Sequence, residues 1–258
     1  MRNSSAEDPD AVTQGFYQNE AVVADYDEAR FASPGGSVLD ALQREAVRRT
    51  IGRNELRGIS ALDVGCGTGR FTGLLMDMGA TVTAVDSSSG MLAEVRRRYP
   101  PARVTLADAR RLPFDSGAFD LGISVWVYNH MVAYEEAIGE LCRVCREKVV
   151  LGLPNMHSLY ILPHVLRRLH LWNGRYTVRS YPGVAPPASI YFALGQVRAL
   201  LQRQGFATAD VVTCALLPLV PNPLARVYPP FEQAARRILR LNGSFMAVAA
   251  TRRDSHRR

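Results

Sequence analysis

The sequence predicts an α/β protein built on a seven-stranded, mostly parallel sheet with helices on both faces. Short apolar runs alternate with segments whose apolar residues recur at helical spacing, which is typical of strand–helix–strand units in a parallel sheet. One apolar run ends in a glycine-rich turn that leads into a helix, Gly65 to Gly69. With 258 residues, 47% of them hydrophobic and 21% charged, the chain has the composition of a globular protein with one large core.

The N-terminal part is predicted to be helical. Residues 1–12 are polar and are expected to form a disordered tail. Apolar residues then recur at helical spacing over Ala11–Arg30 and Val38–Ile51, on either side of the breaker Ser33-Pro34-Gly35-Gly36. The chain is therefore expected to consist of a tail, a helical cap and a main domain: residues 1–12, 13–58 and 59–258.

The main domain supplies the strands and helices of the sheet. The expected strands are Ile59–Val64, Thr81–Val85, Arg103–Leu106, Phe119–Val125, Lys148–Leu153, Phe206–Cys214 and Ser244–Thr251. The expected helices are Phe71–Met78, Met91–Arg98, Val132–Cys145, Ser189–Gln204 and Phe231–Arg240.

The net charge of +7 is unevenly distributed along the chain. Residues 148–258 hold 15 basic and 3 acidic side chains, whereas residues 1–147 hold 16 basic and 21 acidic ones. A basic second part indicates an anionic partner such as nucleic acid, an acidic substrate or a lipid surface. Thirty of the 31 basic residues are arginine, which a GC-rich genome also produces, so both interpretations stay open.

The cysteines predict reduced thiols in a cytoplasmic protein, since four are too few for a disulfide framework: Cys66, Cys142, Cys145 and Cys214. No metal site is expected, because the C-x-x-C pair lacks a second pair of ligands. The N-terminus carries no apolar leader, and no segment reaches the roughly 20 apolar residues that a membrane span needs.

The glycine-rich turn is the strongest functional signal. Glycines at alternate positions after a buried strand, Gly65, Gly67 and Gly69, allow a ligand to approach the backbone and exceed what a structural turn requires. The spacing is G-x-G-x-G, whereas dinucleotide folds prefer G-x-G-x-x-G. An acid, Asp63, stands just before the turn.

Two further acids follow strand ends. Asp86 ends the second strand, where a carboxylate accepts hydrogen bonds from both hydroxyls of a ribose; the serines after it also fit a helix cap. Asp108 and Ala109 follow the third strand, where a carboxylate and a backbone N–H can read the edge of an adenine. On its own, Asp108 is more typical of a loop.

With these motifs the sequence resembles the class I S-adenosylmethionine-dependent methyltransferases, in particular their small-molecule, methyltransferase type 11-like subgroup. The resemblance covers about residues 59–153 and rests on three runs: Asp63-Val-Gly-Cys-Gly-Thr-Gly69, Val85-Asp86, and Ala107-Asp108-Ala109 followed by Leu112-Pro113-Phe114 and Phe119-Asp120. It implies a Rossmann-like fold, S-adenosylmethionine as cofactor and a methyl-transferring enzyme. The segment Cys142–Lys148 lacks the family's Lys-Pro-Gly-Gly turn, which indicates an atypical subgroup.

The resemblance also implies roles for single residues. Gly65, Gly67 and Gly69 would wrap the methionine end of the cofactor, and Asp63 would orient that loop and the cofactor's ammonium group. Asp86 would bind the ribose and Met91 would pack on the adenine. Asp108 with Ala109 would read the adenine edge, and the backbone at Ser124 and Val125 would close on the amino-acid portion.

A family motif ahead of the first strand, Y-D-x-x-R, matches Tyr26-Asp27-Glu28-Ala29-Arg30. By resemblance, Arg30 would bind the cofactor carboxylate, and Tyr17 and Tyr26 would roof the site. A surface helix with a Glu/Arg pair is the alternative.

The insert at residues 155–188 occupies the position where this fold grows its substrate lid. Within it, residues 159–172 have the pattern of a basic amphipathic helix. Such a helix closes over an apolar acceptor, lies on an anionic bilayer as a peripheral contact, or packs on the core with its arginines in solvent.

The acceptor is less well defined by the sequence. His130 follows the fourth strand, where an imidazole could act as the catalytic base for a hydroxyl or enol; a capping or core histidine is the preferred alternative. The insert favours a hydrophobic small-molecule acceptor, and the basic second part leaves RNA, including tRNA, as the alternative. A nicotinamide-dependent oxidoreductase is a second alternative, disfavoured by the glycine spacing. The oligomeric state stays open.

Overall fold

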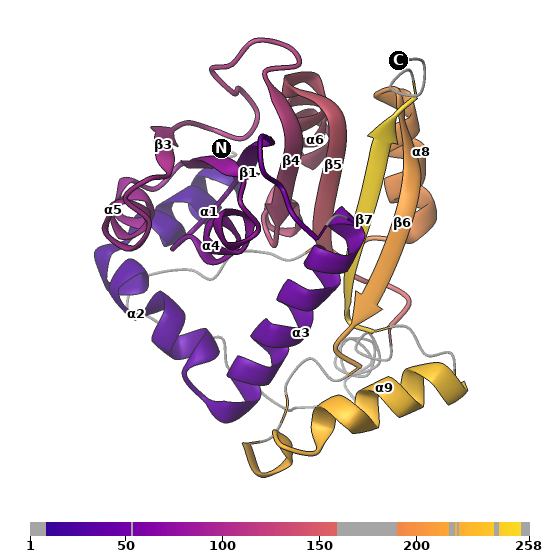
Figure 1. The fold of residues 1–258 in the computed structure, drawn as a ribbon. Helices are drawn as coiled ribbons and strands as arrows, with labels where there is room; N and C mark the ends of the chain where they lie inside the picture. The colour runs from indigo at the N-terminus through magenta and orange to yellow at the C-terminus, as the bar shows by residue number, and fades with distance from the viewer. Residues whose placement is uncertain are drawn as a thin grey trace, which may run out of the picture.

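The computed structural model describes residues 9–52, 54–158, 190–216, 220, 222–239 and 243–253. In these residues the chain forms a seven-stranded sheet with the order β3-β2-β1-β4-β5-β7-β6 (Figure 1). The strands are β1 Ser60–Val64, β2 Thr81–Asp86, β3 Arg103–Leu106, β4 Phe119–Val125, β5 Cys145–Pro154, β6 Phe206–Cys214 and β7 Phe245–Arg252. The predicted seven-stranded sheet is therefore confirmed.

Most neighbouring strands are parallel. The pairs β1–β2, β1–β4, β2–β3 and β4–β5 are parallel, and β7 runs antiparallel to both β5 and β6. Because the carboxyl ends of parallel strands meet at one edge of a sheet, the residues that follow β3, β2, β1 and β4 lie next to one another.

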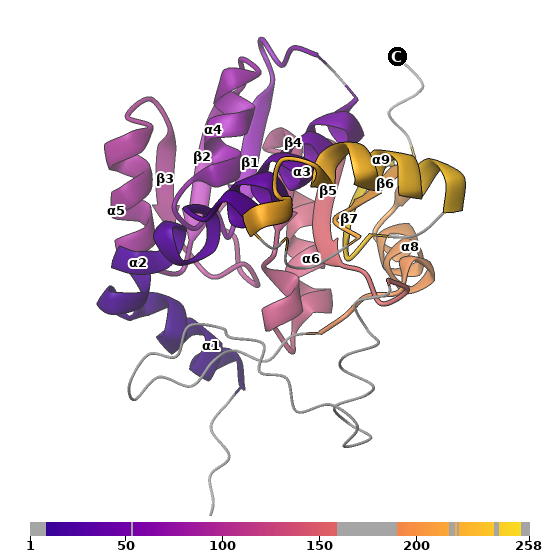
Figure 2. The same cartoon turned by 90° about the horizontal axis from the view of Figure 1, so that it is seen from below.

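Helices cover both faces of the sheet, as Figure 2 shows. They are α1 Pro9–Gln18, α2 Glu20–Phe31, α3 Pro34–Ile51, α4 Arg70–Asp77, α5 Ser89–Arg98, α6 Tyr134–Val144, α8 Leu194–Arg203 and α9 Tyr228–Leu239, with short 3₁₀ helices η1 Tyr128–His130 and η2 Asn222–Leu224. Alternate residues of β1 enter two separate cores: Leu62 and Val64 pack with α6 and α8, and Ala61 packs with α3 and α4. This alternation is what a strand buried on both faces requires.

The helical cap differs from its prediction in three ways. Residues 9–12 are the first turn of α1 instead of part of a tail. The single helix expected over Ala11–Arg30 is broken at Asn19, whose side chain accepts hydrogen bonds from the backbone of Ala21 and Val22 and so caps α2.

The expected breaker before α3 is instead its start. Ser33 caps the helix by accepting a hydrogen bond from the backbone N–H of Gly36 at 3.0 Å, and Pro34 occupies the first turn, where its missing N–H costs nothing.

Elements after β5 follow the predicted order. Helix α8 begins at Leu194, later than the expected Ser189, and α9 begins at Tyr228. The insert expected to form a lid lies outside the described residues from position 159 onward, together with the amphipathic segment 159–172. No helix in the described part of the chain is long and apolar enough to cross a membrane.

Candidate functional site

A cavity of about 470 Å³ lies between the helical cap and the carboxyl edge of the sheet. Its volume is in the range of small-molecule sites. Most of the site residues that the sequence predicts line its wall: Arg30, Gly65, Gly67, Asp86, Met91, Asp108, Ala109, Val125 and His130. Tyr17 and Tyr26 also line it, whereas Asp63 and Gly69 do not.

The sheet order fixes how the wall residues follow one another. Asp108 follows β3, Asp86 ends β2, Gly65 follows β1 and Trp126 follows β4. Because neighbouring strands are about 4.8 Å apart, these four positions span roughly 14 Å. The cavity is therefore elongated across the strand ends, with the glycine turn near its middle.

The glycine turn leaves open space for a ligand. Gly65 and Gly67 have positive φ angles of 67° and 54°. A Cβ atom at Gly67 would meet no heavy atom within 4 Å, whereas one at Gly65 would lie 2.2 Å from Val127 Cγ2. Gly67 thus provides a surface that a ligand can approach, and Gly65 allows the loop after β4 to pack against the turn.

Gly69 has a role in packing. It stands at the N-terminus of α4 with a φ angle of 90°, and a Cβ there would lie 2.8 Å from the ring of Tyr99. The sequence predicts that Gly69 wraps the cofactor; the structure places it behind the turn, where it lets Tyr99 of the neighbouring segment come close.

Asp63 lies beneath the turn, with an exposed fraction of 2%. Its Oδ2 atom accepts a hydrogen bond from the Thr72 hydroxyl at 2.7 Å, which joins β1 to α4. Burial raises the pKa of Asp63 to about 7, and the nearby carboxylate of Asp86 adds to the increase. Asp63 therefore supports the turn from inside the protein without reaching the cavity.

Asp63→Asn is expected to flatten the dependence of stability on pH. The unfolded chain ionises Asp63 near pH 4 and the folded chain near pH 7. Between these values the folded state binds more protons, so the free energy of unfolding falls as pH rises. Urea unfolding without ligand at pH 5 and pH 8 should show that the wild type loses roughly 3 kcal/mol more than Asp63→Asn, because each pKa unit is worth about 1.4 kcal/mol.

The exposed Asp77, substituted in the same way, is the control for this measurement. If the free energy of unfolding changes equally with pH in the wild type and in Asp63→Asn, Asp63 does not have a raised pKa in the folded protein.

Asp86 fastens the turn to the next helix. Its two carboxylate oxygens accept hydrogen bonds from the backbone N–H groups of Gly67 and Ser88, both at 2.9 Å. Burial raises the pKa of Asp86. Each oxygen has a second lone pair, so the carboxylate that holds the turn can also accept the hydroxyls of a ribose.

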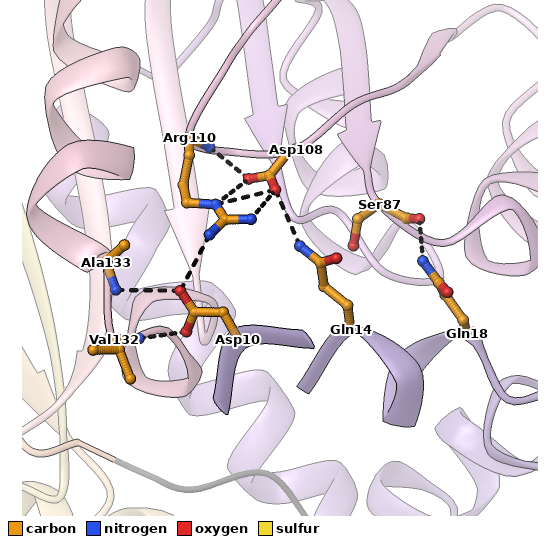
Figure 3. A network of polar contacts seen from close by, with 8 residues as sticks. All are labelled: Asp10, Gln14, Gln18, Ser87, Asp108, Arg110, Val132 and Ala133. Carbon is orange, nitrogen blue, oxygen red and sulfur yellow. Dashed lines mark hydrogen bonds and ion pairs between the residues drawn. The ribbon is translucent and has the colours of Figure 1, made fainter. Parts of the chain in front are cut away.

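Asp108 belongs to a polar network that closes one end of the cavity (Figure 3). Its carboxylate pairs with the Arg110 guanidinium at 2.6 Å and accepts a hydrogen bond from Gln14 Nε2 at 3.0 Å. The Arg110 contact holds the pKa of Asp108 below its usual range. Asp108 is therefore a fixed, ionised acceptor at the end of β3.

The same network anchors α1 over the cavity. Asp10 is 4% exposed, and its carboxylate accepts hydrogen bonds from the backbone N–H groups of Val132 at 2.6 Å and Ala133 at 3.3 Å (Figure 3). Nearer the other end of α1, Gln18 donates to the Ser87 carbonyl at 3.2 Å. The first helix of the chain thus forms part of the cavity wall.

The Y-D-x-x-R motif of α2 contributes in two ways. Asp27 accepts a hydrogen bond from the Thr68 hydroxyl in the glycine turn at 2.7 Å and pairs with Arg98 of α5. Arg30 stacks on the ring of Tyr26 at 3.9 Å, lines the cavity and has no carboxylate partner among the described residues. A half-buried cation of this kind suits an anionic ligand group.

His130 lies on the cavity wall beside α1. Its Nε2 atom is 2.9 Å from Asn129 Nδ2, and its ring centroid is 5.8 Å from that of Tyr17. Burial raises the pKa of Tyr17 above its ordinary range, so its phenol stays protonated at neutral pH. The imidazole therefore lies on the cavity wall between an amide and a phenol that stays protonated.

Sequence reasoning missed the wall beyond β4. Gln43 of α3, Arg70 of α4 and Trp126 meet there, although 27 and 83 residues separate Gln43 from the other two. Only the positive φ angle of Trp126, 61°, marks the position as unusual, and no sequence pattern reveals it.

The cysteines do not contribute a nucleophile. Burial raises the pKa of the Cys66 thiol on the cavity wall well above its usual range, and all four cysteines are buried. No group of three or more His, Cys, Asp or Glu side chains within the described ranges is arranged to hold a metal ion.

Comparison with known sequences identifies one segment. Residues 62–152 match the family model described as a methyltransferase domain. A malonyl-[acyl-carrier protein] O-methyltransferase of Serratia marcescens is 36% identical over 107 residues, which are 41% of this chain and 42% of that protein. A demethylmenaquinone methyltransferase of Beutenbergia cavernae is 34% identical over 108 residues, or 42% and 44% of the two chains. The chain thus spans less than half the length of these curated relatives.

Solved structures share the fold over nearly the whole chain. Magnesium protoporphyrin IX methyltransferase of Synechocystis, determined with bound S-adenosylhomocysteine, has a TM-score of 0.66 and 14% identity, covering 95% of this chain and all of that one. A 1,6-didemethyltoxoflavin-N1-methyltransferase of Burkholderia thailandensis has a TM-score of 0.58 and 17% identity, covering 98% and 93%.

Proposed function

We propose that this chain, whose residues 62–152 match the methyltransferase domain model, transfers a methyl group from S-adenosylmethionine to a hydrophobic small molecule. The observation that carries the proposal is the cavity across four neighbouring strand ends, with the glycine turn in its middle. The protein would be an enzyme of the class I S-adenosylmethionine-dependent type.

The residues present fit this cofactor. The open space over Gly67 provides a cradle that a Cβ would begin to fill. Asp108 offers a fixed carboxylate for the adenine amine, and Asp86 offers lone pairs for the ribose. Arg30, without a carboxylate partner in the described chain, supplies the cation for the methionine carboxylate. Asp108, Asp86 and the glycine turn follow one another along the strand ends in the order of adenine, ribose and amino acid.

The protein's contribution to transfer would be orientation and exclusion of water. S-adenosylmethionine supplies a methyl group on a positively charged sulfur, and transfer forms the bond from the acceptor to the methyl carbon as the sulfur–methyl bond breaks. The strand ends would hold the donor, and the cap helices would exclude water, so that the acceptor approaches in line at about 3 Å. The acceptor proton would leave to water or to His130.

The two curated relatives support an acceptor of the small-molecule type, but their names give different acceptors. One is named for malonyl-[acyl-carrier protein] and the other for demethylmenaquinone. The cavity itself supports a hydrophobic acceptor, because its wall beyond the glycine turn includes three aromatic side chains: Phe31, Phe71 and Trp126.

Isothermal titration tests the cofactor. We expect S-adenosylmethionine and S-adenosylhomocysteine to bind with similar affinity, because the chain contacts the parts they share, and NAD not to bind. Binding of NAD and not of S-adenosylmethionine would contradict the proposal and favour an oxidoreductase.

A gel shift with bulk tRNA over a series of salt concentrations tests whether RNA is the acceptor. Binding that persists, with a slope of log affinity against log salt concentration that corresponds to several phosphate contacts, would favour RNA.

His130→Ala is expected to leave cofactor affinity unchanged and to lower turnover less than a hundredfold. A base is optional in displacement from a sulfonium, and His130 already contacts Asn129 and Tyr17. The measurements are titration with S-adenosylhomocysteine and release of that product in the presence of an acceptor. A turnover loss above a hundredfold with unchanged cofactor affinity would instead make His130 the base.

A further inference from the structure

One end of the cavity is built from residues to which the proposed cofactor site assigns no role. Adenine, ribose and amino acid would extend over the ends of β3, β2 and β1, so the next position along the sheet, the end of β4, borders the methyl group. Trp126 stands there. Gln43 of α3 and Arg70 of α4 join it on the cavity wall.

Gln43 is held in a single orientation by two donors. The Trp126 indole N–H donates to Gln43 Oε1 at 3.0 Å, and Arg70 Nη2 donates to the same oxygen at 2.7 Å. Indole and guanidinium groups can only donate, so this oxygen is the acceptor and Nε2 is the outer atom of the amide. No residue in the described part of the chain accepts a hydrogen bond from Gln43 Nε2. The amide therefore offers two N–H donors at the wall of the cavity.

The charge at this end is balanced within the protein. Arg70 Nε lies 2.7 Å from Asp40 Oδ1, and both side chains are mostly buried. An anionic ligand group gains little from a guanidinium that already faces a carboxylate. Arg30 has no carboxylate partner in the described residues. When cofactor and acceptor are both bound, an anionic group is therefore expected beside Arg30. A ligand beside Gln43 is therefore expected to be uncharged.

The side chains around Gln43 pack against one another. The Arg70 guanidinium is 4.6 Å from the ring centroids of both Phe31 and Phe71. Trp126 is fixed by a backbone hydrogen bond to Gly152 at 2.9 Å and by a ring contact with Phe245 at 5.6 Å. Its positive φ angle is a strained conformation that this packing maintains. Aromatic walls around a single pair of donors suit a planar ring that carries an oxygen.

We propose that the end of the cavity formed by Gln43, Arg70 and Trp126 binds the acceptor, and that this acceptor is an uncharged planar ring whose carbonyl or ether-like oxygen accepts a hydrogen bond from Gln43 Nε2. Gln43 is a positioning residue, because it holds the ring next to the methyl group without taking part in bond making. The proposal rests on the proposed function, since it needs the methyl donor over the neighbouring strand ends.

Equilibrium dialysis with two matched probes tests the proposal. The probes are 2-acetylnaphthalene, which only accepts hydrogen bonds, and 2-ethylnaphthalene, which has nearly the same shape and no oxygen. Both are measured on protein saturated with S-adenosylhomocysteine. Gln43→Glu keeps an oxygen for Trp126 and Arg70 but removes both N–H donors. Gln196→Glu makes the same chemical change on an exposed glutamine of α8 and is the control.

The expected result is a change in selectivity. The ratio of the ketone's dissociation constant to the hydrocarbon's should rise about tenfold in Gln43→Glu and stay unchanged in Gln196→Glu, because a lost hydrogen bond to a buried carbonyl costs roughly that much. Affinity for S-adenosylhomocysteine should be the same in all three proteins. Gln43→Met, which also lacks the donors, replaces Gln43→Glu if thermal unfolding shows that the added charge prevents folding.

The outcomes separate the two proposals. Wild-type protein that fails to bind S-adenosylhomocysteine contradicts the proposed function. A saturated complex with an unchanged probe ratio in the Gln43 variants contradicts the role of Gln43, while the cofactor assignment stands. A saturated complex that binds neither probe contradicts the planar aromatic class of acceptor.

Discussion

Gly65→Ala is expected to lower the free energy of unfolding by roughly 2 to 5 kcal/mol. The residue has a φ angle of 67°, a conformation that costs an L-residue about 1 to 2 kcal/mol. In addition, the new Cβ would lie 2.2 Å from Val127 Cγ2, and such overpacking costs about 1 to 3 kcal/mol. Urea denaturation of the ligand-free protein measures the loss.

Gly58→Ala is the matched control for this substitution. Gly58 has a φ angle of 75°, yet a Cβ there would meet no heavy atom within 4 Å. It should therefore show the backbone cost alone, about 1 to 2 kcal/mol. The double variant Gly65→Ala, Val127→Ala should recover the part due to the clash. Equal losses for Gly58→Ala and Gly65→Ala would show that Val127 does not pack on the turn.

Asp86→Ala is expected to weaken binding of S-adenosylhomocysteine by about ten- to a hundredfold, or roughly 1 to 3 kcal/mol. The carboxylate would accept the ribose hydroxyls, and it also holds the N–H groups of Gly67 and Ser88 at 2.9 Å. Removing it leaves buried donors unpaired and loosens the turn that faces the cofactor. Isothermal titration gives the affinity.

Asp77→Ala controls for the loss of one acid, because Asp77 is 77% exposed at the end of α4. Asp86→Asn separates the two roles: it keeps one acceptor oxygen and should lose less affinity than Asp86→Ala. If Asp86→Ala binds S-adenosylhomocysteine as tightly as the wild type, Asp86 does not belong to the cofactor site.

The region between β1 and β5 was predictable because its signals are local. A buried strand followed by glycines at alternate positions has few conformations open to it, and the acids Asp86 and Asp108 stand at strand ends that a parallel sheet must bring to one edge. The placement of Gly65, Asp86, Asp108 and Val125 on the cavity wall thus follows from sequence order alone. The exception is Gly69, whose neighbour Tyr99 lies 30 positions away in the chain.

Helix boundaries in the cap were harder to predict, since the same residues favour two structures. Ser33 and Pro34 are typical both of a turn that ends a helix and of a helix start, and Asn19 is an ordinary polar residue until its side chain caps α2. Asp10 looks like part of a polar tail, and it becomes buried only because the backbone of Val132 and Ala133 offers two hydrogen-bond donors to it.

The sequence by itself determined the sheet, the glycine turn and the acids at the strand ends of this protein, because period-2 and helical patterns and glycine chemistry act over a few neighbouring residues. The tertiary structure alone decided which groups meet beyond the turn. Gln43, Arg70 and Trp126 come from separate elements, and their hydrogen bonds form only after α3 and α4 pack on the sheet. This end of the cavity, the proposed acceptor site, depends on packing between distant segments, which no local pattern encodes.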